Sequence, residues 1–99
     1  MTAYVFVEID FHDPSALEEY KRLATIAGEK HGATYLARGG ATELLEGMEQ
    51  PKRVTLLQFP DMASAKAWYE SPEYTEARGV RAQAASGRFI AVEGLDASA

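Results

Sequence analysis

Arginine and aromatic side chains are the residues of this chain best suited to holding a small molecule. A guanidinium group grips a carboxylate or phosphate through two parallel hydrogen bonds. Tyrosine and tryptophan combine an apolar ring with a polar tip that can bind a ligand. The candidates for ligand-binding residues are Tyr20, Arg38, Arg53, Trp68, Tyr69 and Arg81.

The same side chains also have structural roles open to them. Arg38 and Arg88 could instead form ion pairs with carboxylates such as Glu46 and Glu93, because 15 acidic residues outnumber 10 basic ones. Aromatic residues at helical spacing often belong to the core. The sequence leaves both alternatives open beside the ligand site.

No familiar catalytic or metal-binding pattern accompanies these residues. His12 and His31 are the two histidines, and neither stands in a spacing typical of metal ligands. Near a helix C-terminus, His31 is suited to a favourable charge interaction. There are no cysteines, and no nucleophile elbow, phosphate loop or dinucleotide fingerprint occurs. We therefore expect no metal and no cofactor, and an acid–base group could be a tyrosine, a carboxylate or a histidine.

Charge and length narrow the class of protein. The net charge is −5 and the basic residues are scattered, which disfavours nucleic-acid binding. No apolar run approaches the ~20 residues of a membrane span, and no signal peptide is recognisable at the start. We expect a cytoplasmic protein with no membrane partner. The 99 residues predict one domain over 1–95, followed by a short polar tail over 96–99.

The first half of the chain reads as strand, helix, strand. Residues 3–10 are rich in β-branched and aromatic side chains and are apolar on both faces, which predicts a central strand covered on both sides. Asp13 and Pro14 then open a helix that Gly32 ends. A second strand is predicted over 33–38.

The second half reads as strand, helix, strand as well. Gly39-Gly40 suggests a bulge after which the second strand resumes over 42–46, and the third strand covers 52–59. Asp61 caps a helix over 62–70, and Ser71-Pro72 starts another that runs towards Ser86. A final strand is predicted over 88–94. This order predicts an α+β fold, the ferredoxin-like βαββαβ arrangement with a four-stranded antiparallel sheet.

Short segments in a fixed order carry a family resemblance over nearly the whole chain. They are Asp13-Pro14 with Tyr20, Ala37-Arg38-Gly39-Gly40, Leu45-Glu46-Gly47, Gln58-Phe59-Pro60, Ala65-Lys66-Ala67-Trp68-Tyr69, Ser71-Pro72-Glu73-Tyr74, Gly87-Arg88 and Val92-Glu93-Gly94. In these segments the chain resembles the small bacterial family called domain of unknown function 1330. The resemblance implies a dimeric α/β barrel, in which the open faces of two ferredoxin-like sheets pack together. It implies no settled activity.

A homodimer also has a physical motive, because two helices cover only one face of a four-stranded sheet whose first strand is apolar on both faces. Two functions remain open. The first is a small-molecule site, extended to a cofactor-free enzyme acting on an aromatic compound, with a pocket on the order of a few hundred cubic ångströms that holds Arg38 with Trp68 or Tyr69. The alternative is a non-catalytic dimeric binding or accessory protein with no pocket.

Overall fold

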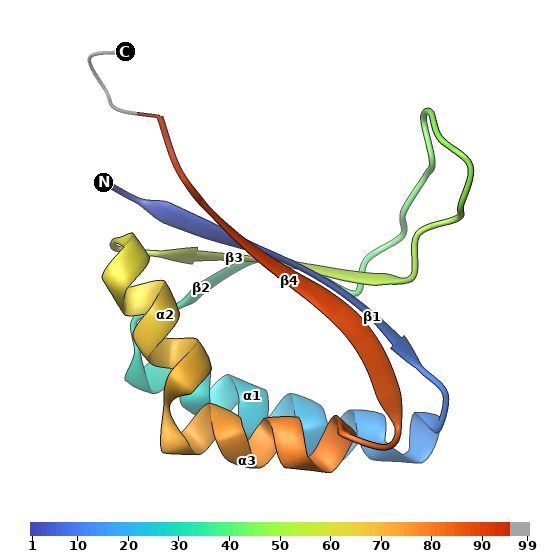
Figure 1. The fold of residues 1–99 in the computed structure, drawn as a ribbon, viewed down its shortest axis with the longest axis horizontal. Coiled ribbons are helices and arrows are strands. Elements are labelled where there is room, and N and C mark those ends of the chain that lie inside the picture. The colour runs from blue at the N-terminus through green and yellow to red at the C-terminus, as the bar shows by residue number, and fades with distance from the viewer. Residues whose placement is uncertain (96–99) are drawn as a thin grey trace.

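Four strands form one antiparallel sheet in the order β2-β3-β1-β4, and the helices all lie against one face of it (Figure 1). The computed structural model describes residues 1–95, so the predicted tail over 96–99 lies outside the described residues. The elements are β1 (Ala3–Phe11), a 3-10 turn (Pro14–Ala16), α1 (Leu17–Lys30), β2 (Thr34–Arg38), β3 (Arg53–Phe59), α2 (Met62–Glu70), α3 (Pro72–Arg81) and β4 (Ala85–Glu93). The predicted ferredoxin-like α+β fold is confirmed.

Polar side chains begin the helical segments at the positions that the sequence indicates. Asp13 and Asp61 each accept a backbone N–H through Oδ1, at 3.1 and 2.7 Å, and the Ser71 hydroxyl accepts one at 3.1 Å. After α1, Gly32 adopts a φ of +77°, the left-handed conformation that glycine tolerates best. Local hydrogen bonding therefore sets the helix boundaries that position the site.

The prediction for the segment around Gly39 was wrong in two respects. The irregularity in the β2–β3 pairing lies between Tyr35 and Ala37, before the glycines. Strand β2 does not resume over 42–46, which belong to a loop that projects away from the helices (Figure 1). The Gly39 N–H still bonds the Val54 carbonyl at 2.8 Å, but a φ of +68° at Gly39 then turns the chain out of the sheet.

The end of the last helix also differs from the sequence expectation. Helix α3 ends at Arg81, short of Ser86, and β4 begins at Ala85. The reason is the length of β1, because Phe11 at its end pairs with Ala85. The Ala84 carbonyl in addition accepts the backbone N–H groups of the two residues that follow β1, at 2.7 and 3.0 Å. Pairing with a distant strand thus ends the helix earlier than its own sequence would.

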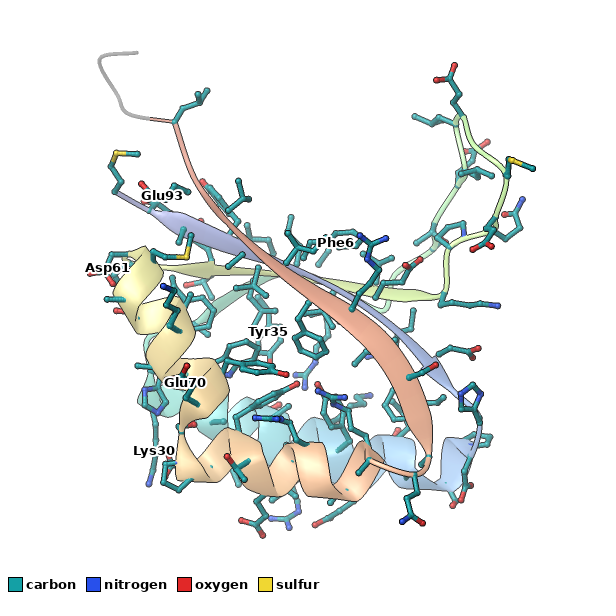
Figure 2. The ribbon with its side chains drawn as sticks, in the orientation of Figure 1. Phe6, Lys30, Tyr35, Asp61, Glu70 and Glu93 are labelled. Atoms are coloured by element: carbon teal, nitrogen blue, oxygen red, sulfur yellow. The ribbon has the colours of Figure 1, made fainter. Side chains whose placement is uncertain are left out.

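Strand β1 is central, as predicted, but only one of its faces is covered within the chain. Val5, Val7 and Ile9 point towards the helices and are buried. On the opposite face Phe6 keeps 36% of its surface exposed and Ile90, its partner on β4, keeps 43%. Figure 2 shows Phe6 on the side of the sheet away from the helices and Tyr35 between the sheet and the helices.

Candidate functional site

The six predicted ligand-binding residues line two separate cavities between the helices and the sheet. Tyr20, Arg38 and Arg53 line an inner cavity of about 20 Å³, close to the volume that one water molecule needs. Tyr69 and Arg81 line a cleft of about 380 Å³ on the other side. Trp68 lines both. The predicted pocket holding Arg38 with Trp68 is therefore too small for a whole organic molecule, and the cleft is the space of suitable size for one.

The walls of the cleft come from α2 and the last residue of α3 on one side and from β4 and β1 on the other. They are largely aromatic and apolar, and the lining residues that matter below are Trp68, Tyr69, Glu70, Arg81 and Phe89. The rings of Tyr69 and Phe89 lie 5.6 Å apart between centroids, within the range of favourable aromatic packing. A flat ring entering the cleft would find aromatic surface to pack against.

Arg81 is one of three charged residues that line the cleft, beside Lys66 and Glu70, and it is the one that packs on aromatic rings. Its guanidinium carbon lies 4.7 Å from the centroid of the Phe89 ring and about as near the Tyr20 and Tyr74 rings, at 5.8 and 6.0 Å. Ring faces of this kind attract a cation without neutralising it. Within residues 1–95, no carboxylate forms an ion pair with Arg81. The charge is therefore held in place and left uncompensated.

Two hydrogen-bond donors beside the cleft have no acceptor. Nε of Arg81 and Nε1 of Trp68 are the buried side-chain nitrogen or oxygen atoms that lack a partner in the described part of the chain. Leaving such a donor buried and unpaired costs about 1–3 kcal/mol. Both belong to residues that line the cleft.

A buried pair of tyrosines supports Arg81 from the core side. The hydroxyl groups of Tyr20 and Tyr74 hydrogen-bond at 2.7 Å, although the residues are 54 positions apart in the sequence. Burial raises the pKa of both phenols above the ordinary value of 10.0, so both stay protonated at neutral pH. Neither phenol is therefore available as a base. The carboxylate among the residues that line the cleft is that of Glu70, which Figure 2 labels on α2.

Arg38 and Arg88 do not form the ion pairs that the sequence allowed. Arg38 donates from Nη2 to the Lys21 carbonyl at 3.0 Å, and its guanidinium carbon lies 4.2 Å from the centroid of the Tyr35 ring. In the described residues neither Arg38 nor Arg88 pairs with Glu46 or Glu93. Arg38 is thus fixed by backbone and ring contacts and keeps its charge.

The histidines lie away from both cavities. His31 caps the end of α1, and its Nε2 lies 3.2 Å from a carboxylate oxygen of Glu73 in the first turn of α3. His12 contacts the Ser86 hydroxyl at 3.2 Å. Neither lines the cleft or the inner cavity, so both serve to join elements.

Sequence reasoning missed Phe89 as a site residue. The alternation of β4 was a usable signal, because Phe89 pairs with Val7, a helix-facing residue of the central strand.

Among residues 1–95, no group of three or more His, Cys, Asp or Glu side chains is placed to hold a metal ion. In the same residues, no helix has the length and apolar character that crossing a membrane requires. The cytoplasmic location stays a prediction.

The fold and the cleft together define a ferredoxin-like α+β protein with an aromatic cleft between its helices and its sheet. Residues 2–95 match the model of the family described as domain of unknown function (DUF1330). The chain belongs to this family. A search of curated proteins found no match to the sequence.

Solved structures share the fold of this chain. A protein of unknown function from Rhodopseudomonas palustris is 21% identical with a TM-score of 0.77, over 96% of this chain and 83% of that one. A dimeric ferredoxin-like protein of unknown function from Jannaschia sp. CCS1 is 18% identical with a TM-score of 0.70, over 95% and 100%. SnoaB, a cofactor-independent oxygenase from Streptomyces nogalater, is 9% identical with a TM-score of 0.67, over 96% and 94%. At these identities the likeness is one of fold.

Proposed function

We propose that this protein binds a small, flat organic anion in the cleft between its helices and β4. The observation that carries the proposal is Arg81, a charged side chain held on the Phe89 ring at the wall of a 380 Å³ cleft with no carboxylate partner among residues 1–95. A carboxylate or enolate on the ligand would supply the missing counter-charge. The aromatic walls would hold its ring.

Cofactor-free turnover of the bound molecule is the extended form of this proposal. SnoaB, a cofactor-independent oxygenase, has the same fold, which supports chemistry without a resident cofactor. Glu70 lines the cleft and is the candidate for a base, whereas Arg81 would stabilise negative charge that develops on the ligand. Replacing Glu70 by glutamine would then abolish turnover and leave ligand binding in place.

The sole tryptophan of the chain offers a direct measurement of binding. Because Trp68 lines the cleft, its fluorescence reports on occupancy without a label. The experiment titrates the protein with a panel of monocyclic and bicyclic aromatic carboxylates, and with the matching neutral alcohols. We expect saturable changes in Trp68 emission for carboxylates that fit and much weaker binding of the alcohols.

Matched variants decide whether Arg81 is responsible. Arg81→Gln should weaken carboxylate binding by about tenfold or more, because a charge-assisted hydrogen bond to a desolvated anion is lost. Arg22→Gln removes the same charge from an exposed arginine that pairs with Glu19 at 2.6 Å, and should leave binding unchanged. If no member of the panel binds, or if both variants behave alike, the proposal is wrong and a non-catalytic dimeric binding or accessory protein becomes the preferred function.

We further propose that the protein is a homodimer assembled through the uncovered face of the sheet. Phe6 stands opposite Leu56 on one side and Ile90 on the other, so an apolar row crosses this face. Leu36, 47% exposed, extends it onto β2. A large exposed apolar face is uncommon in monomers, and the neighbour from Jannaschia is dimeric.

The test of the dimer is the molar mass in solution, measured by light scattering during size-exclusion chromatography. We expect the mass of two chains for the wild type and of one chain for Phe6→Glu, whose charge would be buried in the interface. Glu8→Gln on the same strand is the control and should remain dimeric. A wild type that elutes as one chain at micromolar concentration would refute this assembly.

A further inference from the structure

We propose a second binding site, formed by Arg38 and Arg53 at the inner cavity between α1 and the end of the β2–β3 pair, which takes a small oxyanion group such as a carboxylate or a phosphate. It is distinct from the cleft at Arg81, because the two spaces share only Trp68 among their linings. Its existence does not depend on the function proposed for that cleft.

The register of the sheet brings the two arginines together. Arg38 on β2 pairs with Thr55 on β3, and Arg53 lies two residues before Thr55 on the same strand. Residues two apart on a strand point to the same face, so Arg38 and Arg53 are diagonal neighbours. Such neighbours lie about 7–8 Å apart, within reach of long side chains. Both line the inner cavity, so both face the helices and can meet one anion.

Both guanidinium groups pack against other parts of the chain and leave most of their donors unused. Arg38 spends one donor on the Lys21 carbonyl and rests on the Tyr35 ring. The guanidinium of Arg53 occupies the space beside Gly39 that a Cβ atom would fill. A guanidinium carries five N–H donors, so each group has several left for a ligand. Ordering these side chains in advance lowers the entropy cost of binding.

Charge at the inner cavity is positive and uncompensated. Among residues 1–95, neither Arg38 nor Arg53 forms an ion pair, and the residues lining the cavity include no carboxylate. Lys21 adds a third cation, whose partner Glu18 is 3.7 Å away on the exposed side of α1. In a chain of net charge −5, such a concentration of unpaired positive charge favours a bound anion.

The size of the cavity restricts what can enter. About 20 Å³ of free space admits about one oxygen atom of a carboxylate or phosphate group and excludes a ring. The remainder of a larger ligand would therefore stay outside, next to α1 and the end of β2. The site recognises a head group and not a whole molecule.

The experiment follows the side-chain Nε–Hε resonances of Arg38 and Arg53 by NMR in the full chain. Inorganic phosphate or acetate is titrated to millimolar concentration, with chloride adjusted to keep the ionic strength constant. We expect saturable shifts of both resonances, and a raised melting temperature. The stronger binder of the two shows whether the site prefers a phosphate or a carboxylate.

Three variants separate a built site from nonspecific attraction. Arg53→Gln should weaken anion binding about tenfold or more and leave the fold intact, because Arg53 forms no ion pair among the described residues. Gly39→Ala keeps every charge but displaces the Arg53 guanidinium, so it should weaken binding as well. Arg22→Gln should have no effect. Absence of saturable shifts in the wild type, or equal weakening in Arg22→Gln, would overturn the proposal.

Discussion

The hydrogen bond between Tyr20 and Tyr74 offers the sharpest test of how the core beneath the cleft is held together. The two hydroxyls are 2.7 Å apart, and the residues keep only 8% and 0% of their surface exposed. Removing one hydroxyl leaves the other buried without its partner, whereas removing both leaves two phenylalanine rings of nearly unchanged shape. The effects of the two single replacements on the free energy of unfolding should therefore not add up to the effect of the double replacement.

We expect Tyr20→Phe and Tyr74→Phe each to lower the free energy of unfolding by about 1–3 kcal/mol, the cost of an unsatisfied buried hydroxyl. The double variant should cost less than the sum of the two by about 1–2 kcal/mol, since no hydroxyl is then left unpaired. Urea denaturation at one fixed protein concentration measures all four proteins, and a constant m-value confirms that only stability changes.

Additive effects would refute this reasoning. They would mean that each hydroxyl, once alone, finds another acceptor or donor as good as its present partner. Arg81 is the nearest candidate, since its guanidinium carbon lies 5.8 Å from the Tyr20 ring and 6.0 Å from the Tyr74 ring. In that case the position of Arg81 would depend on the phenols, and the same variants would also alter ligand binding in the cleft.

Two further predictions concern the starts of α2 and α3, and a third concerns the pairing of β4 with β1. A backbone hydrogen bond from the first turn of α2 holds the pKa of Asp61 below its ordinary 3.8. Asp61→Ala should therefore be less stable than the wild type above pH 3.8, and the two should converge as acid titrates the carboxylate through its lowered pKa; parallel acid-denaturation curves would contradict this. Ser71→Ala removes the hydroxyl that accepts from the Tyr74 N–H and should cost about 1–2 kcal/mol in urea denaturation, with threonine as the rescuing control. Gly87→Ala would place a Cβ atom 2.6 Å from the Glu8 carbonyl oxygen and should lower stability by about 1–3 kcal/mol, whereas Gly40→Ala, in open space, should not.

Helix starts and the order of elements were readable in the sequence because they depend on neighbouring residues. Asp61 and Ser71 bond N–H groups only three positions away, so a short window contains the whole interaction. The apolar character of both faces, which marks β1 as a central strand, is equally local, since successive side chains must point to opposite faces. The family resemblance was readable for the same reason, because it consists of short segments in order.

Boundaries that depend on a distant strand were not readable in this way. Helix α3 stops at Arg81 because β4 pairs with β1 through Phe11, more than 70 positions earlier. Likewise the two glycines after β2 end the pairing with β3 where the sequence suggested only a bulge, since the φ of Gly39 and the position of β3 act together.

For the candidate site, residue types could be read along the chain, whereas the grouping of the side chains depends on the packed fold. Residue types alone identified Trp68, Arg81 and Arg38 as side chains suited to a ligand. Their division into an open cleft and a narrow inner cavity follows from where the Trp68 ring packs, since Trp68 lines both spaces. Convergence of side chains depends on how helices settle on a sheet, which is a long-range property that no spacing along the chain encodes.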